Sequence, residues 1–218
     1  MSKIPFTTEQ FLQVFEKYNQ AIYPFQFALI LVAIATVFLA ASRKPLANKL
    51  ISCSLGFLWL WTGIVYHLIF FTTISPPAYV FGTLFIIQGL LFLYEGVFKN
   101  RLSFRLSQKF YGIFGTIFIA YSLVIYPLIG YALGRVFPTA QTFGVPCPTT
   151  IFTFGLLLWT DKRFSLGLLI IPVLWSLVGT SAAFSFGIKE DFGLLVAGTI
   201  GTTIIMRHNF MQKMEKVL

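Results

Sequence analysis

The sequence predicts an all-α membrane protein: a polytopic bundle of seven transmembrane helices, with the N-terminus outside and the C-terminus inside. Three observations predict this fold class, namely an apolar composition, apolar runs of membrane-spanning length and an uneven distribution of basic residues. Of the 218 residues, 57% are hydrophobic and 11% are charged, whereas about a quarter of a soluble domain is charged. A chain with this composition cannot cover its whole surface with polar groups. Part of its surface must therefore face lipid.

Seven apolar segments are candidates for the spans, since a helix needs about 20 residues to cross the hydrocarbon core. The fourth is long and contains Pro127, which predicts a tilt or a kink. The fifth is short, so the chain before it must enter the membrane without helix or stop at its surface. The predicted spans are 24–41, 50–72, 78–98, 109–134, 147–160, 164–185 and 191–207.

The basic residues favour seven spans over the alternative of six. With the N-terminus outside, the inside segments hold 12 of the 16 Lys and Arg residues and the outside segments hold four. This follows the positive-inside rule, and six spans would blur the bias by moving one loop or tail. The net charge of +9 therefore indicates membrane orientation, and no nucleic-acid partner is expected.

Residues 7–23 predict a short helix before the first span. Thr7 or Thr8 can cap it, and Phe11 and Phe15 belong to an apolar stripe at helical spacing. We expect it to lie in the outer membrane interface, or else to pack over the mouth of the bundle. Because the N-terminus lacks the apolar core of a signal peptide, we expect the first span to be an uncleaved insertion signal.

Three stretches carry a resemblance to a known family. They are "PFTTEQFLQVFEKYNQAIYP", "WLWTGIVYHLIFF" and "VPCPTTIFTFGLLLW". They resemble an uncharacterised bacterial family of small multi-pass membrane proteins, which is defined by a domain of unknown function. This resemblance implies a bacterial inner-membrane protein without an established activity, so it assigns no functional residues.

A second, topological resemblance comes from a candidate internal repeat. Residues 58–70 match residues 174–186 at Leu, Trp, Gly and the final Phe, and "FGTL" resembles "FGLL" further on. Three helices, a linker helix and three more in the same direction would form a parallel repeat. That plan is similar to the SWEET family of sugar transporters, although the second span lacks the proline that this family places there.

Small residues mark the helix faces that we expect to pack inward, because they allow helices to approach closely in a membrane. The same faces would suit contacts between copies in a homo-oligomer. These residues are Gly82, Gly89 and Gly96 in the third span, and Gly193, Ala197 and Gly201 in the seventh.

Polar residues inside the second and third spans are candidate site residues. His67, next to Tyr66, shares a helix face with two glycines and should point into the bundle as a proton carrier or ligand, or as a neutral, hydrogen-bonded histidine. Gln88 lies near the middle of the third span and needs a partner on another helix. Glu95 is expected to pair with Lys99 one turn later at the inner interface.

The fourth and seventh spans contribute further polar groups near their predicted outer ends. Pro127 follows Tyr126 and frees a backbone carbonyl, which offers a polar notch. Tyr121 lies five residues earlier and therefore should face another side of a regular helix. Glu190 and Asp191 open the last span, where acids are expected mainly as helix caps.

The motif Pro146-Cys147-Pro148-Thr149 precedes the short fifth span. A proline suits the first turn of a helix, and a threonine can satisfy early backbone donors, so a rigid helix start is the first interpretation. The alternative is a reactive or metal-binding thiol at Cys147, which requires His67 nearby. No metal site and no cofactor are expected.

These features predict a transporter or channel-like protein for a small solute, with an outward-facing polar cavity. A non-transporting binding, sensory or assembly module is the alternative, and an intramembrane enzyme or a metal-binding protein is a minor one. No sequence motif of a hydrolase or phosphate-binding loop is present, so an enzyme is not favoured. The predicted partners are the lipid bilayer and the solute, and the predicted binding residues are Tyr66, His67, Gln88, Tyr126, Cys147 and Thr149.

Overall fold

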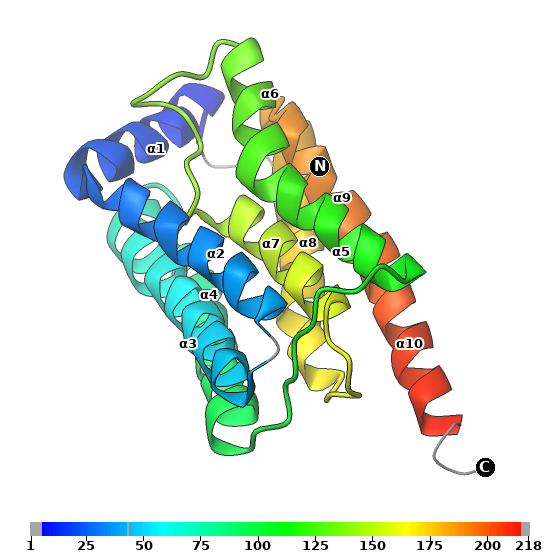
Figure 1. The fold of residues 1–218 in the computed structure, drawn as a ribbon. Helices are drawn as coiled ribbons and strands as arrows, with labels where there is room; N and C mark the ends of the chain where they lie inside the picture. The colour runs from blue at the N-terminus through cyan, green and yellow to red at the C-terminus, as the bar shows by residue number, and fades with distance from the viewer. Residues whose placement is uncertain (1–5, 43, 215–218) are drawn as a thin grey trace.

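The apolar segments form helices that run side by side in a bundle, and the first helix lies across one end of it (Figure 1). The computed structural model describes residues 6–42 and 44–214. Within these residues there is no β-strand, and two isolated β-bridges join Phe104 to Thr160 and Phe143 to Val145.

The first half of the chain forms four helices, two of which continue into π-helical turns. The bounds are α1 (Thr8–Ile22), α2 (Phe25–Ala41), α3 (Pro45–Trp61) with η1 (Thr62–Phe70) and η2 (Phe71–Thr73), and α4 (Ala78–Leu93) with η3 (Tyr94–Phe98).

The second half forms four further helical rods, two of them again interrupted by a π-helical turn. The bounds are α5 (Phe110–Ala120) with η4 (Tyr121–Ile125) and α6 (Tyr126–Ala132), α7 (Pro146–Leu158), α8 (Gly167–Phe186), η5 (Lys189–Asp191), and α9 (Phe192–Val196) with η6 (Ala197–Gly201) and α10 (Thr202–Met214).

Within the described residues, four continuous helices are long and apolar enough to cross a membrane. A fifth span results if α1 and α2, which meet at a bend of 88°, are counted together, and α7 is a shorter apolar helix. The count of seven spans and their orientation therefore stay predictions. The four helices are Pro45–Thr73, Ala78–Phe98, Phe110–Ala132 and Gly167–Phe186.

Helix α1 packs against one end of the bundle, and its place in a membrane interface stays a prediction. It begins with a capping box between Thr7 and Gln10, and the predicted stripe that includes Phe11 and Phe15 is buried. Near its end, the Asn19 amide donates to two carbonyls of the loop 133–145, at 2.6 and 2.7 Å. We call this end of the bundle the lid end.

The opposite end of the bundle holds the loops that follow η3 and α7 (Figure 1), and we call it the basic end because these loops carry six Lys and Arg residues. Its loops, between η3 and α5 and between α7 and α8, are joined by backbone hydrogen bonds such as Arg105 N–H to Trp159 C=O at 2.6 Å. The Lys and Arg residues of these two loops are Lys99, Arg101, Arg105, Lys109, Lys162 and Arg163.

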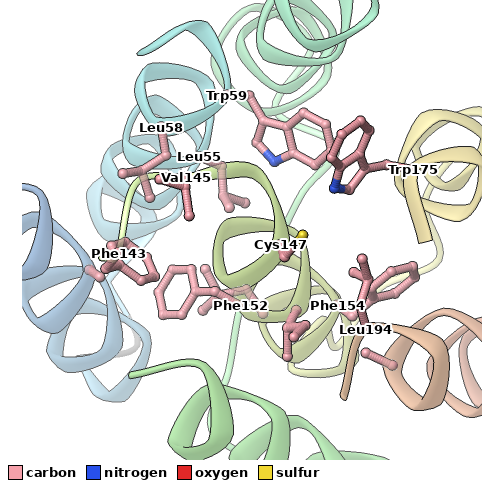
Figure 2. Packing of buried hydrophobic residues seen from close by; sticks show 14 of the residues in the cluster. Leu55, Leu58, Trp59, Phe143, Val145, Cys147, Phe152, Phe154, Trp175 and Leu194 are labelled. Carbon is pink, nitrogen blue, oxygen red and sulfur yellow. The ribbon is translucent and has the colours of Figure 1, made fainter. Parts of the chain in front are cut away.

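Helix α7 is the centre of the bundle, and all of its 13 residues are buried (Figure 2). It can be short because protein covers both of its ends. The loop before it enters the bundle without helix, and Phe143 and Val145 of that loop are buried. Pro146 takes the first helical position, where its missing N–H costs nothing.

Glycines set the closest helix contacts. A Cβ on Gly63 would lie 2.9 Å from the Gly82 carbonyl oxygen, and one on Gly89 equally close to that of Gly56, so α3 and α4 touch through their backbones. In the same way Gly155 of α7 packs against α5. The predicted glycine face of the third span is thus covered by a helix of the same chain.

The remaining predicted small residues are also covered within the chain. Gly96 lies against the Ser52 side chain, Gly193 against the ring of Tyr121, and Gly201 near Phe118. Residues of this kind lead membrane helices to approach closely. Among the described residues, these glycine faces are therefore not free for a second copy of the chain.

Candidate functional site

A cavity of about 250 Å³ lies at the lid end, between α1, η1, α8 and the start of α7. Its wall is mostly apolar and rich in aromatic rings, and it also holds five polar residues. The aromatic residues are Phe6, Phe11, Phe15, Tyr66, Phe71, Phe81, Trp175 and Phe186, and the polar ones are Ser75, Gln141, Cys147, Ser181 and Asp191.

Helix α1 closes the cavity through ring contacts with the bundle. The ring of Phe11 stacks on that of Phe186 with centroids 4.6 Å apart, and Phe15 stacks on Tyr66 at 5.6 Å. Such pairs add to the apolar area that the helix buries. The lid is therefore held by packing of aromatic residues from three separate elements.

The polar end of the cavity is built around Asp191. Helix α8 ends at Gly187, whose positive φ of 69° allows the chain to turn back. The short helix η5 follows and places Asp191 inside the bundle. The Tyr126 hydroxyl contacts both Asp191 Oδ1 and the Gln141 side-chain carbonyl oxygen, and the Cys147 thiol is hydrogen-bonded to Asp191. Asp191 is only 2% exposed.

The neighbouring acid, Glu190, has a different environment. Arg135 binds its carboxylate with two nitrogens, of which Nε lies 2.7 Å from Oε1, and both side chains are largely buried. The Tyr121 hydroxyl donates to the Glu190 carbonyl oxygen at 2.7 Å. One arginine therefore faces two adjacent buried carboxyl groups.

A second, smaller cavity of about 130 Å³ is lined by residues that include Tyr126 and Gln141. Its lining includes Arg135, Glu190 and Thr142, so it is more polar in character. Gln141 lines both cavities, and its Nε2 has no hydrogen-bond partner among the described residues. Gln141 borders both cavities, Tyr126 lines the second one and contacts Gln141, and we call these two side chains the partition.

The structure brings three of the predicted binding residues to this cavity. Tyr66 and Cys147 line it, and Tyr126 contacts its polar end. Figure 2 shows Cys147 on the side of α7 that faces Trp175 of α8. Its Sγ and Trp175 Nε1 would each lie 3.5 Å from a Cβ placed on Gly179.

The other three predicted residues lie outside the lining. His67 is fully buried behind the cavity wall, with its ring centroid 5.1 Å from that of Trp175 and both ring nitrogens without a partner among the described residues. Gln88 donates to the Leu168 carbonyl oxygen at 3.0 Å, as a helix-to-helix contact. Thr149 is buried within α7.

The arrangement around Cys147 does not support the hypothesis of a metal-binding thiol. Trp175 stands beside both Cys147 and His67, and no group of three or more His, Cys, Asp or Glu residues in the described part of the chain could hold a metal ion. A zinc site needs about four such ligands, or three with an open position. The two cysteines are free thiols, with Cys53 exposed on α3.

The expectation that Tyr121 and Tyr126 face different sides is wrong, because the helix between them is not regular. In η4 the backbone N–H of Tyr126 donates to the carbonyl of Tyr121, five residues earlier, as in a π-helix. This wider turn brings both hydroxyl groups to the same turn η5. Pro127 follows directly, in the first turn of α6.

The interpretation of the acids as caps or surface pairs also needs correction. Asp191 precedes α9 without a side-chain capping hydrogen bond, and Glu190 binds Arg135. At the basic end, Glu95 pairs with Arg101 at 3.3 Å, whereas Lys99 lies over the ring of Tyr94. The chain turns after η3, so the arginine, and not the lysine, comes back to Glu95.

Sequence analysis missed Arg135, Gln141 and Trp175 as site residues. Arg135 and Gln141 belong to a loop between two predicted spans, where polar residues are ordinary. Trp175 was considered only as a matching position of the candidate internal repeat. A usable signal was the shortness of the fifth span, because the loop before it had to be buried and its polar groups had to find partners.

Comparison with known proteins gives one match. A family model described as a family of unknown function matches residues 8–216. No curated protein and no solved structure matches the chain, so the similarity to SWEET-type transporters is not shown. Because the matched region covers nearly the whole bundle, from α1 to the end of α10, the chain belongs to the family of unknown function DUF6064.

Proposed function

We propose that the protein binds a small, mainly apolar molecule with a polar group in the cavity under α1. The observation that carries the proposal is the cavity itself, an apolar chamber rich in aromatic rings, in which Cys147 is hydrogen-bonded to Asp191 and Gln141 is linked to Asp191 through Tyr126. Ligand sites in proteins have this character, with an apolar wall and a few polar groups that orient the ligand. The volume of about 250 Å³ corresponds to roughly eight water molecules at ~30 Å³ each.

A cavity-filling variant tests the proposal. Ala182 lines the cavity, whereas Leu177 on the same helix is exposed, so Ala182→Phe should fill the chamber and Leu177→Phe is its matched control. Purified protein in lipid nanodiscs would be screened against small aromatic and aliphatic compounds by thermal unfolding. We expect hits that stabilise wild type and the control but not Ala182→Phe. Equal stabilisation of all three proteins would place the ligand elsewhere.

Transport of the solute is a second candidate function. It is favoured by the second cavity lined by the Tyr126–Gln141 partition and by π-helical turns in several helices, a rare feature that is frequent at functional sites. A transported ligand would pass this partition, and the packed core around α7 would have to open below it. In this proposal the lid end faces the outside of a bacterial inner membrane.

Flux into proteoliposomes tests transport. A ligand found in the screen should accumulate with wild type, and Gln141→Ala should change its rate. His67→Ala and Gln88→Ala probe the two buried polar positions next to the route. If the ligand binds but no flux occurs, the protein is a binding module and not a transporter.

The side on which the lid end lies can be measured separately. Val136→Cys at the lid end and Lys162→Cys at the basic end, each in a background that lacks both Cys53 and Cys147, would be labelled in intact cells with a maleimide that does not cross membranes. We expect labelling of the first variant only. The reverse pattern would invert the proposed orientation.

A further inference from the structure

We infer that the ligand of this cavity is an organic cation with an apolar body, and that it takes the place of a proton on Asp191. The inference rests on the proposed binding function and names its substrate class. It is carried by a charge count at the polar end of the cavity, by the chemistry of the wall and by the hydrogen count around Tyr126.

The charge count leaves one buried carboxyl group without a cation. Glu190 and Asp191 are 1% and 2% exposed, and Arg135 uses two nitrogens to bind Glu190. No salt bridge joins Asp191 to a basic group in the described part of the chain. An ionised carboxylate buried without a partner is strongly unfavourable, so it must hold a proton or meet a cation.

The hydrogen count at the Tyr126 hydroxyl agrees with a proton on Asp191. The Tyr126 hydroxyl lies within hydrogen-bonding reach of two acceptors, Asp191 Oδ1 and Gln141 Oε1, but it carries one hydrogen. With the Gln141 carbonyl oxygen facing Tyr126, both contacts are hydrogen bonds when Asp191 supplies the second hydrogen. A cation that binds Asp191 would release this proton to water, so that charge is conserved.

The wall of the cavity suits a cation better than an anion. Rings of Tyr66, Phe81 and Trp175 line the same cavity as Asp191, and aromatic faces attract ammonium groups. In addition, the unpartnered Gln141 Nε2 is 95% buried by residue and lines the same cavity, so it can donate to an acceptor on the ligand. The expected ligand is a protonated amine with an apolar ring and a nearby hydroxyl or carbonyl oxygen.

The exchange predicts a pH dependence. Burial, with the proximity of Glu190, raises the pKa of Asp191 to about 7, against the hydrogen bond from Tyr126. Cation affinity should therefore rise with pH, up to about tenfold per pH unit below 7, and level off above it. The titratable or charged groups around Asp191 are Tyr66 of η1, Tyr121 of η4, Tyr126 of α6, Arg135, Cys147 of α7 and Glu190.

A matched set of three probes tests the charge. Phenylethanolamine, phenylethanediol and mandelate share a ring and a hydroxyl and differ in an ammonium, a hydroxyl or a carboxylate group. Binding is read as protection of Cys147 from N-ethylmaleimide in a Cys53→Ala background, in nanodiscs. We expect protection by the amine alone, with the release of about one proton per ligand below pH 7.

The outcomes separate the inference from the proposed function. Equal protection by the diol, without proton release, would support the cavity as a binding site and overturn the cation. Protection by mandelate alone would also support the cavity as a binding site and overturn the inference of a cation. If none of the probes, nor any compound that stabilises the protein, protects Cys147, both the site and the inference are wrong.

Variants locate the charge. Asp191→Asn keeps the hydrogen-bonding shape but removes the carboxylate, so amine affinity should fall at least about tenfold and proton release should stop. Glu95→Gln at the basic end is the matched control and should bind as wild type does. Gel filtration and thermal unfolding show whether the variants fold, and a folded Asp191→Asn protein with unchanged proton release overturns the inference.

Discussion

The two ends of the bundle use the same residue types in opposite ways. At the basic end, Arg101 pairs with Glu95 and Arg105 with Asp161, at 3.3 and 3.0 Å, and both arginine side chains are more than half exposed. At the lid end, Arg135 and Glu190 have side chains that are 14% and 1% exposed. The exposure of the arginine distinguishes the two kinds of pair, because the Glu95 side chain is itself only 11% exposed.

The difference shows at which end of the bundle ion pairs contribute most to stability. An exposed pair is screened by water and contributes little, because its partners are solvated with or without each other. A buried pair cannot be opened without leaving a charge in a medium of low polarity. The lid end has such a pair and, beside it, one more carboxyl group, so its structure must depend on charge and on protonation.

The largest expected effect follows from breaking the buried pair. Arg135→Met should lower the unfolding free energy by about 3–5 kcal/mol, because Glu190 stays buried without its partner. At about 2–4 °C per kcal/mol, this is a fall of roughly 6–20 °C in the melting temperature. Fluorescence-detected unfolding of purified protein measures it. A fall no larger than that of Arg101→Met would contradict the contrast between the two ends.

The second prediction concerns pH. Since the folded-state pKa of Asp191 is about 7 and its ordinary value is 3.8, folding is favoured by the proton. The contribution is fully present below about pH 4 and is lost as the pH rises through 7, by at most about 4 kcal/mol at 1.36 kcal/mol per unit. Between pH 4 and 8, the unfolding free energy of wild type should fall as the pH rises. The unfolding free energy of Asp191→Asn should stay nearly constant over the same range. Parallel pH profiles would exclude this role of Asp191.

The third prediction addresses the partition formed by Tyr126 and Gln141. Tyr126→Phe removes the hydroxyl that contacts Asp191 and Gln141, and the two groups are left without that partner in a buried place. We expect a loss of about 1–3 kcal/mol in stability. Tyr94→Phe, at the opposite end and about half exposed, is the control and should change little. An equal loss of stability in both variants would contradict the prediction that the contacts of the Tyr126 hydroxyl stabilise the fold.

The sequence predicted the helices better than it predicted the site. Apolar runs and the small residues of the third span depend on local composition, so the all-helical architecture and the contact of α3 with α4 follow from them. The central place of α7 does not. It follows from the way that α1 and the loop 133–145 cover one end of that short helix, which no periodicity shows.

The site was only partly predictable for a related reason. Tyr66, Tyr126 and Cys147 were found because polar groups in apolar spans are rare. Asp191 looked like a cap, since its burial depends on the turn at Gly187 and on the π-helical turn that brings Tyr126 to it. Those backbone irregularities change which residues share a side, and a regular helical wheel cannot represent them.

The smallest expected effect completes the comparison. Arg101→Met removes the partner of Glu95, whose side chain is only 11% exposed, but the arginine is 58% exposed and water reaches the pair from its side, so the loss of stability should be about 1 kcal/mol, well below that of Arg135→Met. The melting temperature in high salt should be nearly the same for wild type and variant, because exposed pairs are screened. A loss comparable to that of Arg135→Met would mean that the basic end, too, depends on a buried charge. The difference between the two arginine variants is thus the measurement that separates an interfacial ion pair from one that shapes a binding site.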